Sequence, residues 1–327
     1  MSSEPVVGAR FGIPAFARRI EDCLASSNYD AVVVDQHGMA WSLPLIQRIP
    51  AARRPAIVHI AHDFETEVSH SIAASYRGNP LRKLALHLNA RRTAAAERRL
   101  AASAALIVTL TSKDRDLFRS IGAKRSFLVL PPGYDGLRRA ERQLTAASPR
   151  RVAIVGSYSW TAKQINLATF LADADAIFAQ AGIELCIVGS APKAFQARFE
   201  GQLVASRFLG FVDDLGRFLD TCRLGLVVET IGGGFKLKVL DYVLTRTPVA
   251  ALGPALDGQA PEVIEHFIIK PDAEALARAI VDAIDDIEQL NSMQNSAYQA
   301  AVPLYDWREK GRDLLHAIEA LTQRAVE

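Results

Sequence analysis

The segment ETIGGGFKLKVLD, residues 229–241, follows an apolar run at 224–228 and precedes a helix that we expect to begin near Phe235. Its three glycines and its two lysines are Gly232, Gly233, Gly234, Lys236 and Lys238. Consecutive glycines let backbone N–H groups approach an anion closely, and a helix N-terminus favours negative charge. Strand, glycine-rich turn and helix in this order predict a βαβ unit that binds a diphosphate. The structural alternative is a tight turn with surface lysines.

Short apolar runs recur outward from this segment in both directions, with helix-like stretches between most of them. They span residues 31–34, 56–60, 105–109, 127–130, 151–155, 185–188, 208–211, 224–228, 247–252 and 267–270. Continuous runs of this length are typical of strands buried on both faces of a parallel sheet. Alternation with helices predicts an α/β fold with two Rossmann-like domains facing a cleft. The ligand would lie in this cleft, at the carboxyl ends of the strands.

The domain organisation follows from breaks in this pattern. The sequence Pro131-Pro132-Gly133 and the polar, basic stretch 134–150 interrupt it. We therefore expect a first domain at 1–140, a second at 150–300, and a C-terminal helix in 301–327 that packs back toward the first. The first clear strand is 31–34, so the first βαβ unit is shortened or missing. An exposed sheet edge would result, which a partner or a second copy of the chain could cover.

The composition excludes several classes of protein. Of 327 residues, 50% are hydrophobic and 23% are charged, which is typical of a globular chain. The longest apolar run, around 101–110, is shorter than the roughly 18 residues of a membrane span, and residues 1–10 lack a signal-peptide core. Cys23, Cys186 and Cys222 are scattered and odd in number, which argues against disulfides and a cysteine zinc site. We therefore expect a cytoplasmic protein.

The net charge of +2 conceals an uneven distribution. Residues 1–150 contain 22 Lys and Arg against 13 Asp and Glu, whereas the remainder contains 16 against 23. Part of this excess lies in residues 82–99, where six basic residues accompany Glu97 and leucines recur three to four residues apart. This helix could contact an anionic membrane surface at the inner face, or it could simply be a solvated face. Nucleic-acid binding is not expected, because no aromatic residues are interleaved.

Several segments together resemble group 1 glycosyltransferases with the GT-B fold. The resemblance is carried by 229–241 with its continuation 242–250, by GFVDDL at 210–215, by VGSYSW at 155–160 with Lys163, and by Trp307. It covers roughly residues 55–320 and is strongest in the second half. It implies an enzyme that binds a nucleotide-diphosphate sugar.

The resemblance assigns donor-binding roles in the second half. Lys238 would hold the diphosphate, Asp241 the ribose hydroxyls, and Lys163 would supply a second cation. Gly156 and the glycines at 232, 233 and 234 would let the diphosphate approach the backbone. The family needs neither metal nor cofactor, because cations and helix dipoles stabilise the departing diphosphate. Two departures stand out: Gly233 replaces the first of two glutamates, and Ser157 replaces an arginine.

The resemblance also points to the ends of two strands in the first half. His62 follows the run 56–60 and would contact the donor sugar or the reacting centre, unless it is structural. Asp63 and Glu65 would either bind the acceptor or cap the next helix. His37 could line the cleft or lie in a loop.

The main hypothesis is a hexosyltransferase, retaining and metal-independent, that transfers a sugar to a glycan or lipid-linked acceptor in polysaccharide biosynthesis. Gly233 and the short N-terminus motivate a second reading, a non-catalytic relative that binds a nucleotide or glycan or acts as a subunit of a glycosylation complex. A third is a sugar-nucleotide epimerase on the same fold.

Overall fold

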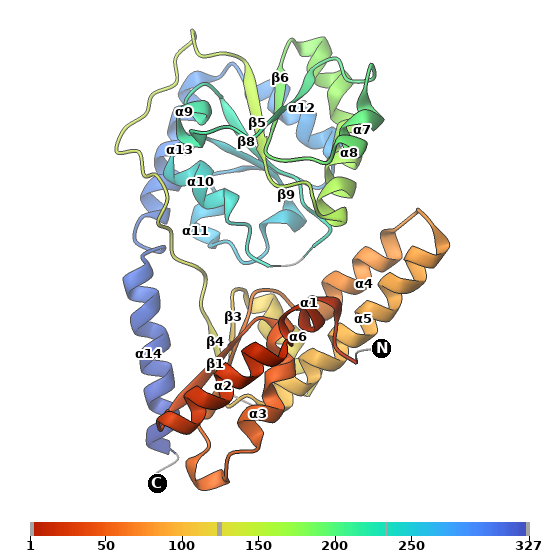
Figure 1. The fold of residues 1–327 in the computed structure, drawn as a ribbon. Coiled ribbons are helices and arrows are strands. Elements are labelled where there is room, and N and C mark those ends of the chain that lie inside the picture. Colours follow the sequence, from red (N-terminus) through yellow and green to blue (C-terminus); the bar gives the residue numbers. More distant parts are fainter. Residues whose placement is uncertain (1–2, 123–125, 233, 325–327) are drawn as a thin grey trace. The chain divides into compact units, whose positions relative to one another are not determined.

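A computed structural model describes residues 3–122, 126–232 and 234–324 (Figure 1). The chain divides into two compact units, each treated separately below. Unit 1 comprises Met1–Pro132, Gly233–Phe235 and Arg308–Glu327, and unit 2 comprises Gly133–Gly232 and Lys236–Trp307. The division after Pro132 precedes the expected boundary at residue 140, because the stretch after Pro132 is bound to unit 2. There the Tyr134 hydroxyl donates a hydrogen bond to Asp241, and the Arg139 backbone N–H donates one to the Leu244 carbonyl oxygen.

Unit 1 is built on a parallel sheet of four strands in the order β1-β2-β3-β4. The strands are β1 (Ala31–Asp35), β2 (Ala56–Ala61), β3 (Leu106–Thr109) and β4 (Ser126–Val129), at the positions predicted from the apolar runs. Among the described residues no strand pairs with the outer side of β1, and Val33 is exposed there. The sequence analysis expected the first βαβ unit to be shortened or missing. In the described residues before β1, the structure has two helices, α1 (Val6–Phe11) and α2 (Pro14–Ser26).

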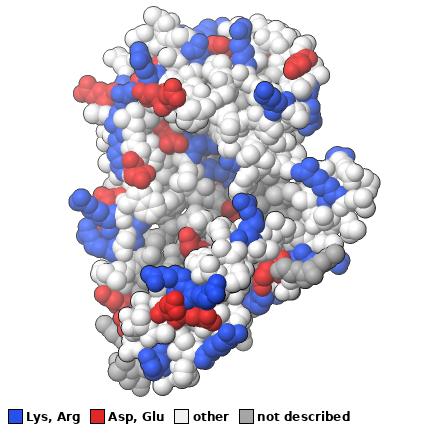
Figure 2. Space-filling model, in the orientation of Figure 1, with Lys and Arg blue, Asp and Glu red and all other residues white. Residues whose placement is uncertain are grey.

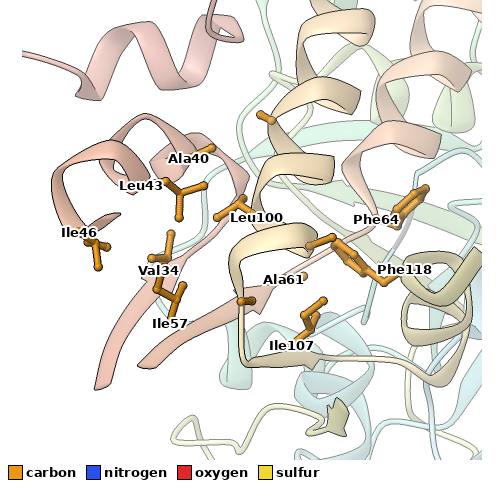
Figure 3. Packing of buried hydrophobic residues seen from close by; sticks show 13 residues of the cluster. Val34, Ala40, Leu43, Ile46, Ile57, Ala61, Phe64, Leu100, Ile107 and Phe118 are labelled. Carbon is orange, nitrogen blue, oxygen red and sulfur yellow. The ribbon is translucent and has the colours of Figure 1, made fainter. Parts of the chain in front are cut away.

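Helices cover both faces of this sheet. On one face a core cluster joins Val34, Ile57 and Ile107 of the strands to Leu100 and Phe118 of the helices (Figure 3). On the other face, α14 (Trp307–Arg324) packs Leu314, Ala317, Ile318 and Leu321 against Val58, Leu106 and Val108. The remaining elements of unit 1 are η1 (His37–Ser42), α3 (Leu43–Gln47), η2 (Ala51–Arg53), α4 (Glu65–Ser75), α5 (Pro80–Ser103) and α6 (Ser112–Ser120).

The long helix α5 begins where proline and asparagine favour it. Pro80 lies in the first turn, and the Asn79 side chain accepts hydrogen bonds from the backbone N–H groups of Leu81 and Arg82. The buried face of α5 consists mainly of alanines, together with Thr93, Glu97 and Leu100. The leucines expected to form an apolar stripe, Leu81, Leu84 and Leu88, are instead exposed.

Unit 2 contains a parallel sheet of six strands in the order β10-β9-β8-β5-β6-β7. The strands are β5 (Arg151–Val155), β6 (Glu184–Val188), β7 (Ser206–Gly210), β8 (Leu224–Val227), β9 (Val249–Leu252) and β10 (Ile268–Lys270), close to the predicted runs. Strands β8 and β9 are buried throughout, as expected for central strands of a parallel sheet.

Helices lie on both faces of the unit 2 sheet (Figure 1). Helices α7 (Thr161–Ala181) and α12 (Ala273–Ala283) pack together on one face, and α10 (Lys238–Leu244), α11 (Pro261–Ile264) and α13 (Ile287–Ala301) on the other. The shorter elements are α8 (Lys193–Gln196), η3 (Ala197–Phe199), α9 (Leu215–Leu219) and η4 (Gly253–Leu256). Helix α10 begins at Lys238 rather than near Phe235, so the loop before it is longer than the sequence indicated.

Candidate functional site

The order of the strands creates a crevice in unit 2. From β5 the chain proceeds to β6 and β7 on one side, then returns to add β8 on the other side of β5. Ligands of open α/β sheets bind at such a topological switch point, outside the carboxyl ends of the strands. Strands β5 and β8 pair only at Val152–Leu224 and Ala153–Gly225, so they separate toward their carboxyl ends.

Tyr242 of α10 contacts the backbone of both strands where the pairing between β5 and β8 ends. Its hydroxyl accepts a hydrogen bond from the Val155 backbone N–H at 2.9 Å and lies 3.3 Å from the Leu226 carbonyl oxygen. The ring is fully buried and packs on Gly225, where a Cβ atom would come within 2.7 Å of it. Tyr242 thereby fixes α10 against the switch point.

Two glycines bring backbone segments into contact at the ends of β5 and β6. Gly189 has φ +117°, and a Cβ atom there would lie 1.8 Å from the carbonyl oxygen of Gly156. Only glycine fits this position, because both the backbone conformation and the space exclude a side chain. A Cβ atom on Gly156 would lie 3.6 Å from the Nζ atom of Lys238. Gly156 therefore lies beside the lysine that was predicted to bind phosphate.

Helix α7 starts directly after this turn. It has 21 residues, and its N-cap residue, Trp160, makes no side-chain hydrogen bond to the N-terminal N–H groups. Such an open N-terminus favours a bound anion. Lys163 lies in the first turn of α7, and its charge contributes to lowering the pKa of Lys238, so the two lysines are near each other.

The loop after β8 is held by a residue that the sequence did not single out. The Asn166 side chain of α7 accepts a hydrogen bond from the Ile231 backbone N–H at 2.9 Å and donates one to the Ile231 carbonyl at 2.7 Å. Gly232 and Gly234 have positive φ angles of +114° and +71°, as a glycine loop predicts. Gly233 lies outside the described residues.

Lys238 forms a buried ion pair with Glu229, through its Nζ atom and Glu229 Oε1. Burial lowers the pKa of Lys238, and the Glu229 carboxylate opposes that shift. Glu229 is 5% exposed, and its second oxygen, Oε2, has no hydrogen-bond partner in the described part of the chain. The sequence analysis assigned no role to Glu229, so this pairing was not foreseen.

Asp241 lies one turn after Lys238 on α10. Its Oδ1 atom accepts a hydrogen bond from the Tyr134 hydroxyl at 3.0 Å. Burial raises the pKa of Asp241, and the tyrosine hydrogen bond and Lys238 oppose the shift. One carboxylate oxygen is thus engaged by Tyr134, another residue that the sequence did not indicate.

In unit 1, the predicted residues lie at the carboxyl ends of β1 and β2. His62 Nε2 is 2.8 Å from Asp35 Oδ1, and both side chains are more than half exposed. Gln36 has φ 57° and ψ 159°, a region that is essentially reserved for glycine. This backbone turn places Asp35 and His37 side by side at the edge of the sheet.

His37 and Glu65 form the second pair at this edge, with 3.5 Å between Nδ1 and Oε1. Burial lowers the pKa of His37 to about 4. Burial, with nearby Asp63, Glu97 and Asp114, raises the pKa of Glu65 to about 8. Both groups are therefore neutral at pH 7: the Glu65 carboxyl is protonated and the His37 imidazole is uncharged.

Helix α4 is capped by residues other than those proposed for this role. Glu97 of α5 accepts hydrogen bonds from the backbone N–H groups of Glu65 and Thr66, each at 2.8 Å, and Asp114 accepts one from Phe64 at 3.0 Å. Long-range carboxylates thus satisfy the helix N-terminus. Glu65 therefore does not cap α4, and its proposed contact with the acceptor stays a prediction.

Two other arrangements do not form sites. Asp173 and Asp175 lie two residues apart in α7 and do not form a carboxylate pair for a ligand. The Asp175 carboxylate instead accepts hydrogen bonds from the backbone N–H groups of Val204, Ala205 and Ser206. Within the described ranges, no three His, Cys, Asp or Glu residues could share a metal ion, and no helix is long and apolar enough to cross a membrane. A cavity of about 560 Å³ between β10 and α13 is lined partly by Glu265, Asp286 and Glu288, so it does not suit an anionic ligand.

Comparison with known protein families finds a match over part of unit 2. Residues 149–286 match the family described as "Glycosyl transferases group 1". No curated protein sequence matches the chain significantly.

Solved structures share the fold over nearly the whole chain. HepE from Anabaena, in complex with UDP and glucose, is 16% identical with a TM-score of 0.70, over 97% of this chain and 84% of that protein. TarM is 12% identical with a TM-score of 0.69, over 92% of this chain and 57% of TarM, so this chain spans little more than half of TarM. A UDP-forming trehalose-phosphate synthase from Burkholderia xenovorans is 11% identical with a TM-score of 0.67, over 94% of this chain and 79% of that protein.

The family match covers the switch point of unit 2, and the structural matches cover both Rossmann-like units. Both agree with the resemblance found in the sequence. Residues 149–286 match the group 1 glycosyltransferase family, and the chain as a whole shares the GT-B fold of the solved glycosyltransferases.

Proposed function

We propose that the protein transfers a hexose from a nucleotide-diphosphate sugar to a glycan or lipid-linked acceptor, with retention of configuration. The observation that carries the proposal is the convergence of Gly156, Lys238 and the open N-terminus of α7 at the switch point of unit 2. HepE, which shares the fold, has been solved with UDP-glucose. A uridine nucleotide is therefore the first donor to test.

Electrostatic stabilisation of the leaving diphosphate is the chemistry that these groups can perform. Negative charge develops on the diphosphate as the bond to the sugar breaks, and fixed positive groups lower the energy of that state. Lys238, Lys163 and the α7 dipole supply such groups without a metal ion, and Asp241 would hold the ribose. We propose that no metal is required, which predicts full activity in excess EDTA.

The acceptor would be bound by the edge of unit 1. The two pairs Asp35–His62 and His37–Glu65 offer hydrogen-bond donors and acceptors to hydroxyl groups. In this proposal His62 contacts the reacting sugar, and Asp63, Glu65 and His37 contact the acceptor. The exposed leucines and basic residues of α5 would hold the enzyme at the anionic inner face of the membrane, where lipid-linked acceptors are found.

The experiment that tests the donor site is replacement of Lys238. Lys238→Ala removes the buried cation, and we expect the affinity for UDP to fall by at least about tenfold, as for loss of a charged hydrogen bond. Isothermal titration calorimetry measures this, with Lys193→Ala on α8 as the control. Unchanged affinity would disprove the donor-site assignment.

One observation favours a second candidate, a non-catalytic relative that binds nucleotide. Glu229 already neutralises Lys238, and Gly233 lacks the carboxylate expected of an active member. Release of UDP from UDP-glucose distinguishes the two. Slow release indicates an enzyme, whereas binding without release indicates a binding protein.

A further inference from the structure

Glu229 is the buried charged residue that the proposed donor chemistry leaves unexplained. It follows β8 at the switch point, on the opposite side of the crevice from Gly156, which follows β5. Glu229 Oε1 is paired with Lys238. Its Oε2 is buried and has no hydrogen-bond partner in the described residues. A carboxylate oxygen removed from water without a partner is strongly destabilising, so such groups are rare unless a ligand completes them.

The neighbouring side chains cannot supply the missing donor. Glu229 contributes to raising the pKa of Tyr158 and of Tyr242, which places both phenols near it. The Tyr242 hydroxyl is engaged with the backbone of β5 and β8, and the Tyr158 hydroxyl lies 3.4 Å from the Ile154 carbonyl oxygen. Both phenols therefore face backbone groups, and Oε2 is left for a group that enters the crevice.

The chemistry of a nucleotide sugar limits which of its groups can donate a hydrogen bond to Glu229 Oε2. Phosphate oxygens are negatively charged at pH 7 and have no proton to donate to a carboxylate. Ribose hydroxyls are assigned to Asp241. The sugar moiety carries the remaining hydroxyl groups, and each can donate one hydrogen bond.

We propose that Glu229 is a specificity-determining residue whose Oε2 accepts a hydrogen bond from a hydroxyl of the donor's sugar, while Oε1 holds Lys238 for the diphosphate. The proposal rests on the proposed function, because it assumes that the crevice binds a nucleotide-diphosphate sugar. It predicts that the sugar increases the affinity of the diphosphate, and that Glu229 is responsible for this increase.

The test compares UDP with UDP-glucose in one protein at a time. The ratio of their dissociation constants isolates the contribution of the sugar, because effects on the shared diphosphate cancel. In Glu229→Gln, the charged acceptor is lost, and we expect the advantage of UDP-glucose over UDP to shrink by roughly tenfold. The affinity for UDP itself should stay the same or rise, because Lys238 loses its counter-charge.

Two variants serve as matched controls. Lys238→Ala and Asp241→Asn act on groups that both ligands share, so each should weaken UDP and UDP-glucose alike and leave the ratio unchanged. An unchanged ratio in Glu229→Gln would overturn the proposal and indicate that Oε2 holds water or ribose. Failure of the wild-type protein to bind UDP would instead contradict the proposed donor, and this proposal with it.

A second measurement avoids the variant altogether, should Glu229→Gln not fold. Deoxyfluoro analogues of UDP-glucose replace one hydroxyl at a time by a group that cannot donate a hydrogen bond. One analogue should lose roughly tenfold in affinity for the wild-type protein while the others lose little. Equal affinity across the series would overturn the proposal.

Discussion

The two units have the same kind of sheet but differ in where they can hold a ligand. In unit 2 the strand order reverses at β5, and the strands on either side separate to form a crevice that contains buried charges. In the described part of unit 1, strands β1 to β4 follow one another in sequence order without a reversal. Its polar residues consequently lie at the edge of the sheet, and His62 and Asp35 are largely exposed. The strand order, more than the residue types, determines which unit can enclose a ligand.

The charged groups of the two units differ in the same way. In unit 2 a lysine is buried with a glutamate, and the pair lies in the crevice. In unit 1 the buried carboxylates Glu97 and Asp114 satisfy the N-terminus of α4. Burial of charge thus serves ligand binding in our proposal for unit 2, and fold stability in unit 1.

The largest expected effect comes from filling the contact between the β5 and β6 turns. Gly189→Ala would place a Cβ atom 1.8 Å from the Gly156 carbonyl oxygen, at a φ angle that only glycine adopts readily. We expect the free energy of unfolding to fall by about 3 kcal/mol or more and UDP binding to be lost. Chemical denaturation and calorimetry measure the two effects.

Gly201→Ala is the matched control for that substitution. Gly201 also has a positive φ angle, +69°, but a Cβ atom there meets no atom within 4 Å. This variant should cost only about 1 kcal/mol and retain UDP binding. Equal losses in the two variants would show that backbone strain, rather than the contact with Gly156, explains the effect.

A smaller effect on the stability of unit 1 is expected from pH. Burial raises the pKa of Glu65 to about 8 and of Glu97 to about 7, so the folded state holds protons that the unfolded chain releases near pH 4.5. Burial lowers the pKa of His37 and of His59 to about 4, which favours the folded state above pH 6.5. Below pH 6.5 the two trends oppose each other.

Between pH 6.5 and 8 only the carboxyl groups contribute, so the stability of unit 1 should decrease as the pH rises. Thermal denaturation should show its melting temperature falling by a few degrees over this range. Glu65→Gln removes the group with the highest pKa and should flatten the decrease. A melting temperature that rises over this range would contradict the assigned protonation of Glu65.

The smallest effect on stability is expected from the exposed leucines of α5. Leu81 is 78% exposed, and Figure 2 shows Lys and Arg side chains on the part of the surface formed by α4 and α5. Replacing Leu81, Leu84 and Leu88 by serine should change the free energy of unfolding by only about 0.5 kcal/mol. Binding to vesicles containing phosphatidylglycerol should weaken severalfold, because apolar area and basic charge act together.

Leu315→Ser, on the exposed face of α14, is the control for the vesicle experiment. It removes an exposed leucine away from the basic residues of α5 and should leave vesicle binding unchanged. Equal binding by the wild-type protein to neutral phosphatidylcholine vesicles would argue against an anionic surface as the partner. The basic residues of α5 would then be a solvated face.

Local sequence patterns were enough to predict the strands and a glycine-rich turn before Lys238. Each of these depends on neighbours along the chain: continuous β-branched runs form buried parallel strands, and adjacent glycines allow positive φ angles.

The side-chain contacts between distant segments, in contrast, depend on the folded arrangement of the chain. Glu229 pairs with Lys238 across the loop, Asn166 holds Ile231 from a separate helix, and Glu97 caps a helix that begins more than thirty residues before it in the sequence. Such contacts follow from how strands and helices are brought together, and spacing along one chain contains little information about them. The start of α10 at Lys238 was missed for the same reason. Packing of α10 against the switch point, through Tyr242 and Gly225, outweighs the local pattern that favoured Phe235.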